Sequence, residues 1–98
     1  MKLTAIQADL LRHLRSAVEA KPNRRVVYCS ECLGWLPYVF YHWVEVDGQD
    51  ISKTFPLDWH RADLEALERV GLLAKIDEWQ NPQDEYDTKI TYEVPPPA

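Results

Sequence analysis

The residues with the greatest capacity for chemistry are two cysteines and three histidines. Cys29 and Cys32 are separated by two residues and precede Leu33-Gly34, a spacing in which two thiolates can hold zinc from a tight turn. Zinc requires four ligands and the sequence has no second cysteine pair, so His42 and His60 would have to complete the site. We favour the interpretation that both cysteines are small, half-buried free thiols and that the protein binds no metal or cofactor.

Catalytic motifs are not found in the sequence. The three glycines form neither a phosphate-cradling loop nor a Gly-x-Ser-x-Gly nucleophile elbow. A thioredoxin-type redox role would require a βαβ element order around Cys29 and Cys32, which the sequence does not predict. His13, His42 and His60 have acidic residues nearby, but any charged small domain shows the same. We therefore predict that the protein is not an enzyme.

The chain is long enough for one domain. It has 98 residues, of which 46% are hydrophobic and 28% charged, a composition typical of a folded globular protein. We expect a single domain over residues 1–94 and a flexible, proline-rich tail over residues 95–98. No apolar run approaches the roughly 20 residues that a membrane helix needs, and no secretory leader is visible. These features predict a cytoplasmic protein that does not contact a membrane.

Charge is unevenly distributed along the chain. Residues 1–25 contain six Lys or Arg and two acidic residues, whereas residues 58–98 contain four and ten. The formal net charge of −5 argues against broad, charge-driven binding to nucleic acid. The asymmetry is typical either of basic and acidic docking faces or of the solvated surface of an ordinary domain.

The N-terminal segment predicts a helix and then a short strand. Thr4 and Gln7 form a capping-box pattern, so the helix is expected to begin near Ala5. Pro22 ends it, because proline cannot continue the hydrogen-bond ladder. The β-favouring run Val26-Val27-Tyr28 then predicts a brief strand.

Residues 29–57 permit more than one interpretation. A short helix could start at Ser30. The segment 38–46 is rich in aromatic and β-branched residues and precedes Asp47-Gly48, so we predict a hairpin about that turn. An amphipathic helix over residues 38–45 is the alternative. The hairpin would place Val44 opposite Ile51 and Phe40 opposite Phe55, with Tyr41 and Trp43 on the other face.

The C-terminal part predicts a helix followed by a long hairpin. Asp58 is the expected N-cap, and Gly71 stands where a left-handed residue can end the helix. Residues 72–79 and 86–94 have period-two spacing and are expected to pair about an acidic tip at residues 80–85. This pairing places Ile76 opposite Ile90, Ala74 near Tyr92 and Asp77 opposite Lys89.

This order of elements resembles a winged helix-turn-helix domain of bacterial or phage type. The most specific segment is Asp63-Leu64-Glu65-Ala66-Leu67-Glu68-Arg69-Val70-Gly71-Leu72-Leu73, which is similar to the end of a recognition helix and the entry to the wing. The resemblance is strongest over residues 58–94. It implies an α+β fold with an N-terminal helix, a short strand, an irregular or hairpin middle, a recognition-type helix and a C-terminal β-hairpin wing.

The resemblance implies a small DNA-binding transcriptional regulator. In such domains the third helix enters the major groove and the wing contacts the DNA backbone or minor groove. The implied contacts to double-stranded DNA are Trp59, His60 and Arg61 at the start of the helix, with Arg24 and Arg25 as phosphate contacts. A homodimer is expected, because paired half-sites are the usual route to specificity.

The charge of the wing favours a second hypothesis. Surfaces that face DNA need Lys or Arg, whereas this wing is acidic and Glu65 and Glu68 crowd the helix. Winged helices also serve as protein-interaction modules, and tryptophan is favoured at interfaces. The alternative is therefore a phage- or plasmid-type interaction module that engages a basic protein surface without binding DNA. Its predicted contact residues are Trp43, Trp79, Asp84, Glu85 and Asp87.

Overall fold

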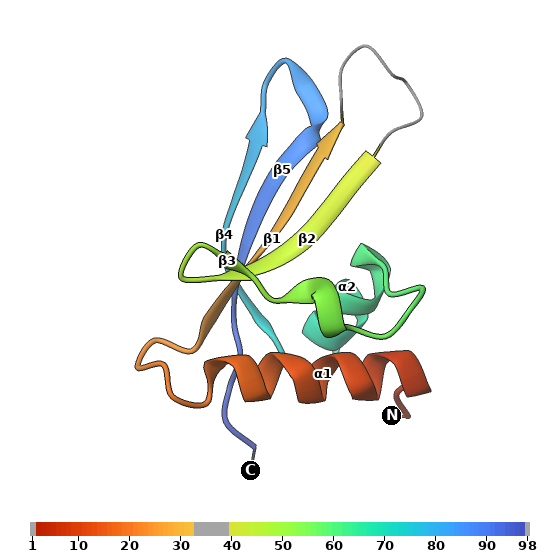
Figure 1. Ribbon diagram of the computed structural model, residues 1–98, viewed down its shortest axis with the longest axis vertical. Coiled ribbons are helices and arrows are strands. Elements are labelled where there is room, and N and C mark those ends of the chain that lie inside the picture. Colours follow the sequence, from red (N-terminus) through yellow and green to blue (C-terminus); the bar gives the residue numbers. More distant parts are fainter. Residues whose placement is uncertain (1, 33–39, 98) are drawn as a thin grey trace.

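The computed structural model describes residues 2–32 and 40–97, without the side chains of Cys32, Phe40, Glu85 and Tyr86. Within these residues the chain forms an α+β fold, as predicted (Figure 1). The helices are α1 (Ala5–Val18), the 3₁₀ turn η1 (Ser52–Thr54) and α2 (Arg61–Arg69). The strands are β1 (Arg25–Cys32), β2 (Phe40–Val46), β3 (Gln49–Asp50), β4 (Ala74–Asn81) and β5 (Asp84–Glu93).

The strands form one antiparallel sheet with β1 at its centre. Its order is β3-β2-β1-β5-β4, so β1 joins an N-terminal hairpin to a C-terminal one. The predicted strand at residues 26–28 lies in the first half of this eight-residue strand. Tyr28, Cys29 and Ser30 of β1 are all buried, which fits a strand that is paired along both of its edges.

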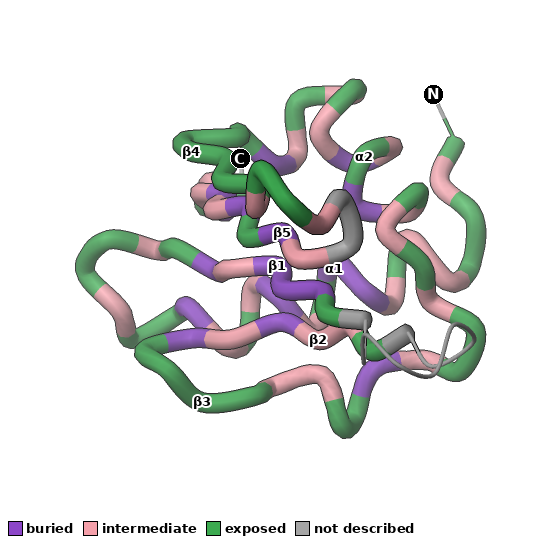
Figure 2. The backbone as a smooth tube through the Cα atoms, turned by 90° about the horizontal axis from the view of Figure 1, so that it is seen from above, coloured by how far each residue is buried: buried purple, intermediate pink, exposed green. Residues whose placement is uncertain are grey.

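One face of the sheet packs against the helices. Tyr28, Val44 and Ile90 occupy paired positions in β1, β2 and β5 and are buried with Leu14 of α1 and Leu67 of α2. Both helices lie near the end of the sheet at which β1 begins, and the other ends of the strands project beyond them (Figure 1). The tube coloured by burial shows the same sidedness: buried segments of the central strands lie near α1 and α2, while β4 is exposed (Figure 2).

The start of α1 confirms the predicted capping box. The Gln7 backbone N–H donates to Thr4 Oγ1, and the Thr4 backbone N–H donates to Gln7 Oε1, both at 3.1 Å. Two N–H groups that the helix cannot pair internally are thereby satisfied. Leu10, Leu14 and Val18 form the buried stripe that the spacing predicts. Neither helix of the described chain is long and apolar enough to cross a membrane.

The N-terminus of α2 differs from the prediction. Asp58 is not the N-cap, because its φ of 67° is left-handed and the helix starts three residues later at Arg61. His60 holds the N-cap position, and its backbone N–H donates to Asp63 Oδ2 at 2.9 Å. The predicted C-terminus is confirmed: Gly71 has a φ of 83° and the Leu72 N–H donates to the Leu67 carbonyl at 2.9 Å, a Schellman ending.

The hairpin prediction for the middle segment is confirmed near its turn. Asp47 and Gly48 both have positive φ, and the Ile51 N–H donates to the Val44 carbonyl at 2.8 Å. Residues 40–46 are a strand, so the alternative helix is wrong there. Pairing of Phe40 with Phe55 is also wrong, because the chain leaves the sheet at η1. Ser30 belongs to β1, and the rest of the short helix predicted from it lies outside the described residues.

The C-terminal hairpin forms in a different register from the predicted one. An irregularity between Lys75 and Asp77 shifts β4, so Ile90 lies opposite Glu78 and not Ile76. The same shift places Asp77 opposite Thr91, Lys75 opposite Tyr92 and Trp79 opposite Lys89. The connection is also tighter than predicted, since β4 and β5 are separated only by Pro82 and Gln83.

Candidate interaction surface

The face of the sheet that points away from the helices carries a row of four paired residues. Trp43 in β2 is paired with Cys29 in β1, Cys29 with Lys89 in β5, and Lys89 with Trp79 in β4. Directly opposed residues of antiparallel strands project to the same side of a sheet. The row therefore places a tryptophan on each side of Cys29 and Lys89, and we call this side the open face.

Aromatic side chains are accessible on the open face. Trp79 is 46% exposed and Tyr41, two residues before Trp43, is 54% exposed. Trp43 itself is half-buried. Tyr41 and Trp43 were predicted to share a face, and the alternation of β2 places both opposite the buried Val44. Such a group of Trp and Tyr side chains outside the core is typical of an interface.

Glu45 is held beside the ring of Trp43. The Trp43 indole Nε1–H donates to Glu45 Oε2 at 2.7 Å, and both side chains are half-buried. The indole N–H lies in the plane of the ring, so the Glu45 carboxylate is held at the edge of the indole and the hydrogen bond occupies neither face of the ring. This pair combines the two groups that recognise a cation: an aromatic ring and a negative charge.

The electrostatics of Cys29 show which charges surround the row. Burial raises the pKa of the Cys29 thiol to about 11, and the negative charge of Glu45 adds to the rise. Lys89 acts in the opposite direction, while Glu31 and Asp50 raise the pKa further. Cys29 is 1% exposed and its thiol stays protonated near neutral pH, so it is neither a nucleophile nor a thiolate ligand there.

Of the predicted acidic residues of the wing, Asp87 extends the open face toward the tip of the β4–β5 hairpin, whereas alternation along β5 places Asp84 on the other side. Asp84 is the first residue of β5 and is half-buried. Asp87 lies two residues before Lys89 and accepts a hydrogen bond from Asn81 Nδ2 at 3.2 Å. The side chain of Glu85 lies outside the described part of the structure.

Trp59, a predicted DNA contact, packs against the core. Its indole stacks on the His42 imidazole at 4.2 Å between ring centroids and 12° between planes. The rings of Tyr28 and Phe55 meet it edge-on at 6.1 and 5.3 Å. The aromatic surface of Trp59 is thus largely engaged within the protein.

The other predicted DNA contacts fall into two groups. His60 is exposed and Arg61 is half-buried beside Glu65, with Nε 3.4 Å from the carboxylate. This end of α2 lies near the start of α1, because Gln7 Nε2 donates to Asp63 Oδ1 at 3.3 Å. Arg24 and Arg25 instead follow the far end of α1, a separation of about 20 Å along the axis of a fourteen-residue helix.

The sheet rules out the four-ligand zinc arrangement weighed from the sequence. His42 is paired with Ser30, so it projects to the helix side, whereas Cys29 projects to the open face. His42 and Cys29 therefore cannot bind one ion. Among the residues that the structure describes, no group of three or more His, Cys, Asp or Glu side chains could hold a metal.

Sequence reasoning placed Tyr41 on one face with Trp43, but it missed Glu45 and Lys89 as members of one surface with the two predicted tryptophans. Alternation within residues 40–46 signals that Tyr41, Trp43 and Glu45 share a face. The link to Lys89 depends on β1 lying between the two hairpins, which no local pattern reveals.

Comparison of the chain with known protein families, with curated proteins and with solved structures finds no significant match.

Proposed function

We propose that this protein is a protein-interaction module whose open face binds a basic surface of a partner protein. The observation that carries the proposal is the row that places Trp43 and Trp79 on one side of the sheet, away from the helices. Interface energy is concentrated in such aromatic anchors. The acidic hairpin tip adjoins the same face and supplies the charge expected of a surface that attracts a basic partner.

Charge complementarity supports a cationic partner. Alternation along the strands adds Glu31, Glu45 and Asp77 to the open face, and the positive charge of Lys89 does not balance them. An arginine side chain can stack on an indole and donate to a carboxylate at the same time, so it suits the Trp43 and Glu45 pair best.

A capture experiment tests this proposal. The wild-type protein and a Trp79→Ala variant are immobilised, and the proteins that each retains from a cell extract are identified. Leu57→Ala is the matched control, because Leu57 is 88% exposed but belongs to the loop before α2. A partner retained by the wild type and the control but lost with Trp79→Ala supports the proposal. Identical retention by all three proteins contradicts it.

DNA binding by a winged-helix-like regulator is the second proposal. The observation in its favour is that His60 is exposed at the N-terminus of α2, next to Arg61, on the helix that the resemblance equates with a recognition helix. Fluorescence anisotropy of a labelled mixed-sequence duplex tests it at low and at physiological salt. Binding that weakens steeply with salt and is lost with Arg61→Ala supports DNA binding. No binding at low salt leaves protein interaction as the function.

A further inference from the structure

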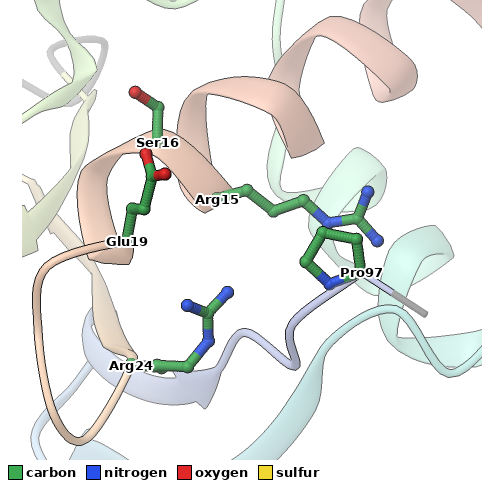
Figure 3. A pocket seen from close by; sticks show the side chains of 5 residues that line it. All are labelled: Arg15, Ser16, Glu19, Arg24 and Pro97. Atoms are coloured by element: carbon green, nitrogen blue, oxygen red, sulfur yellow. The ribbon is translucent and has the colours of Figure 1, made fainter.

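We propose that a pocket at the C-terminal end of α1 binds a small anion that carries a phosphate or carboxylate group. The pocket is lined by Arg15, Ser16 and Glu19 of the helix end, Arg24 of the following loop and Pro97 of the C-terminal tail (Figure 3). Its volume is about 280 Å³, just below the range of ordinary small-molecule sites. It is separate from the open face, so this inference does not depend on the proposed function.

Two guanidinium groups reach this pocket from different elements. In Figure 3, Arg15 extends along α1 toward Pro97, and Arg24 extends from the loop toward the helix. Arg24 is fixed in place, because its Nε–H donates to the Val94 carbonyl at 2.8 Å while the Val94 N–H donates to the Arg24 carbonyl at 2.8 Å. These bonds leave the terminal nitrogens of Arg24 to face the pocket.

Arg15 lines the pocket together with Arg24. Its Nε atom is buried from solvent and has no hydrogen-bond partner among the described residues. Because water cannot reach this atom, a bound anion would be held by the terminal nitrogens of Arg15, and Nε–H would report binding as part of the same guanidinium group. Guanidinium groups bind phosphate and carboxylate through paired N–H donors, so the chemistry of the pocket matches such an anion.

Glu19 and Pro97 set further requirements on the ligand. The Glu19 carboxylate also lines the pocket and opposes a bound anion, so a single small anionic group is favoured over a polyanion. The Pro97 ring offers an apolar wall beside Arg15. These features fit a phosphate or carboxylate attached to a small organic group.

The test is an NMR titration of the full chain at constant ionic strength, with methyl phosphate and acetate as separate probes against a chloride reference. The Arg15 Nε–H resonance of the wild type should shift and saturate with one or both probes, and the pair of titrations identifies the preferred group. Arg15→Gln should weaken binding about tenfold or more, whereas Glu19→Gln should strengthen it about threefold.

Arg12→Gln is the matched control. It removes the same charge from the same helix, but Arg12 is exposed, pairs with Asp9 and does not line the pocket. Its affinity should equal that of the wild type. A linear, non-saturating shift of the wild-type Arg15 Nε–H with both probes would overturn the proposal even without any variant. Equal weakening by Arg12→Gln and Arg15→Gln would overturn it too, because it would show attraction to general positive charge.

Discussion

Trp43 and Trp79 lie at opposite ends of one cross-strand row, although 35 residues separate them in the sequence. The row crosses four neighbouring strands, so the backbone positions of the two tryptophans stand about 14 Å apart at ordinary strand spacing. Cys29 and Lys89 fill the positions between them. This spacing is suited to two anchor side chains of one partner surface, and it depends on β1 lying between the two hairpins.

Substitution by alanine should destabilise the fold much more at Trp59 than at Trp79. Trp59 stacks on His42 and packs against the core, so Trp59→Ala should lower the free energy of unfolding by about 3 kcal/mol. Trp79 is 46% exposed, so Trp79→Ala should change it by less than about 1 kcal/mol. Urea denaturation followed by circular dichroism measures both. A larger loss with Trp79→Ala would show that this indole belongs to the core.

Glu45→Gln should weaken binding of the basic partner without loss of stability. The glutamine oxygen can still accept the hydrogen bond from Trp43 Nε1, whereas the negative charge is removed. We expect affinity to fall about fivefold to tenfold. Glu19→Gln is the control, since it removes one negative charge at the C-cap of α1. An equal effect of both variants in a binding titration would assign the attraction to net charge alone.

The Cys29 thiol should resist alkylation in the folded protein. Burial and then Glu45 raise its pKa to about 11, so almost no thiolate exists at pH 8. In a Cys32→Ser background, iodoacetamide should modify Cys29 slowly in buffer and rapidly in urea. Mass spectrometry gives both rates. Rapid modification of the folded protein would mean that Trp43 and Lys89 do not cover the thiol.

Stability should fall as the pH drops below about 6.5, in part because of His42. Burial, followed by the positive charge of His60, lowers the pKa of His42, so the folded state disfavours the protonated ring. The contribution of the neutral ring is complete above the unfolded pKa of about 6.5 and is lost as the pH falls through the lower folded pKa. His42→Gln should therefore lose less stability than the wild type between pH 7 and pH 5. If urea denaturation showed that both proteins lose the same free energy of unfolding between pH 7 and pH 5, this role for His42 would be excluded.

Gly71→Ala should destabilise the fold by about 1 kcal/mol. Gly71 has a φ of 83° at the end of α2, a conformation that costs a residue with a Cβ atom about this much. Nothing lies within 4 Å of the added Cβ position, so the effect is conformational and not steric. A thermal unfolding midpoint equal to that of the wild type would contradict it.

The sequence predicts those parts of the fold that local chemistry specifies. The capping box at Thr4, the turn at Asp47-Gly48 and the left-handed end at Gly71 each depend on a few neighbouring residues, and all three are present. The register of β4 with β5 could not be predicted, because it depends on an irregularity between Lys75 and Asp77. The start of α2 was misplaced because Asp58 takes a left-handed turn conformation instead of the N-cap position.

The candidate surface was only partly predictable for the same reason. Trp43 and Trp79 were expected to be accessible from their places in two separate hairpins. Their common face requires long-range pairing through β1, which sequence periodicity does not encode. Conversely, the winged-helix resemblance implies that Trp59 contacts DNA, whereas its indole stacks on His42. This stack links β2 to the loop before α2, and no local sequence pattern signals it.

The most direct test of the interaction surface is a ¹H–¹⁵N NMR titration of the wild-type protein with a short arginine-rich peptide, which follows the indole N–H resonances. We predict that the Trp43 and Trp79 indoles shift and saturate together, while the Trp59 indole does not move. Unchanged Trp43 and Trp79 resonances throughout the titration would contradict the account. The contradiction would be complete if duplex DNA instead shifted the amides of His60 and Arg61.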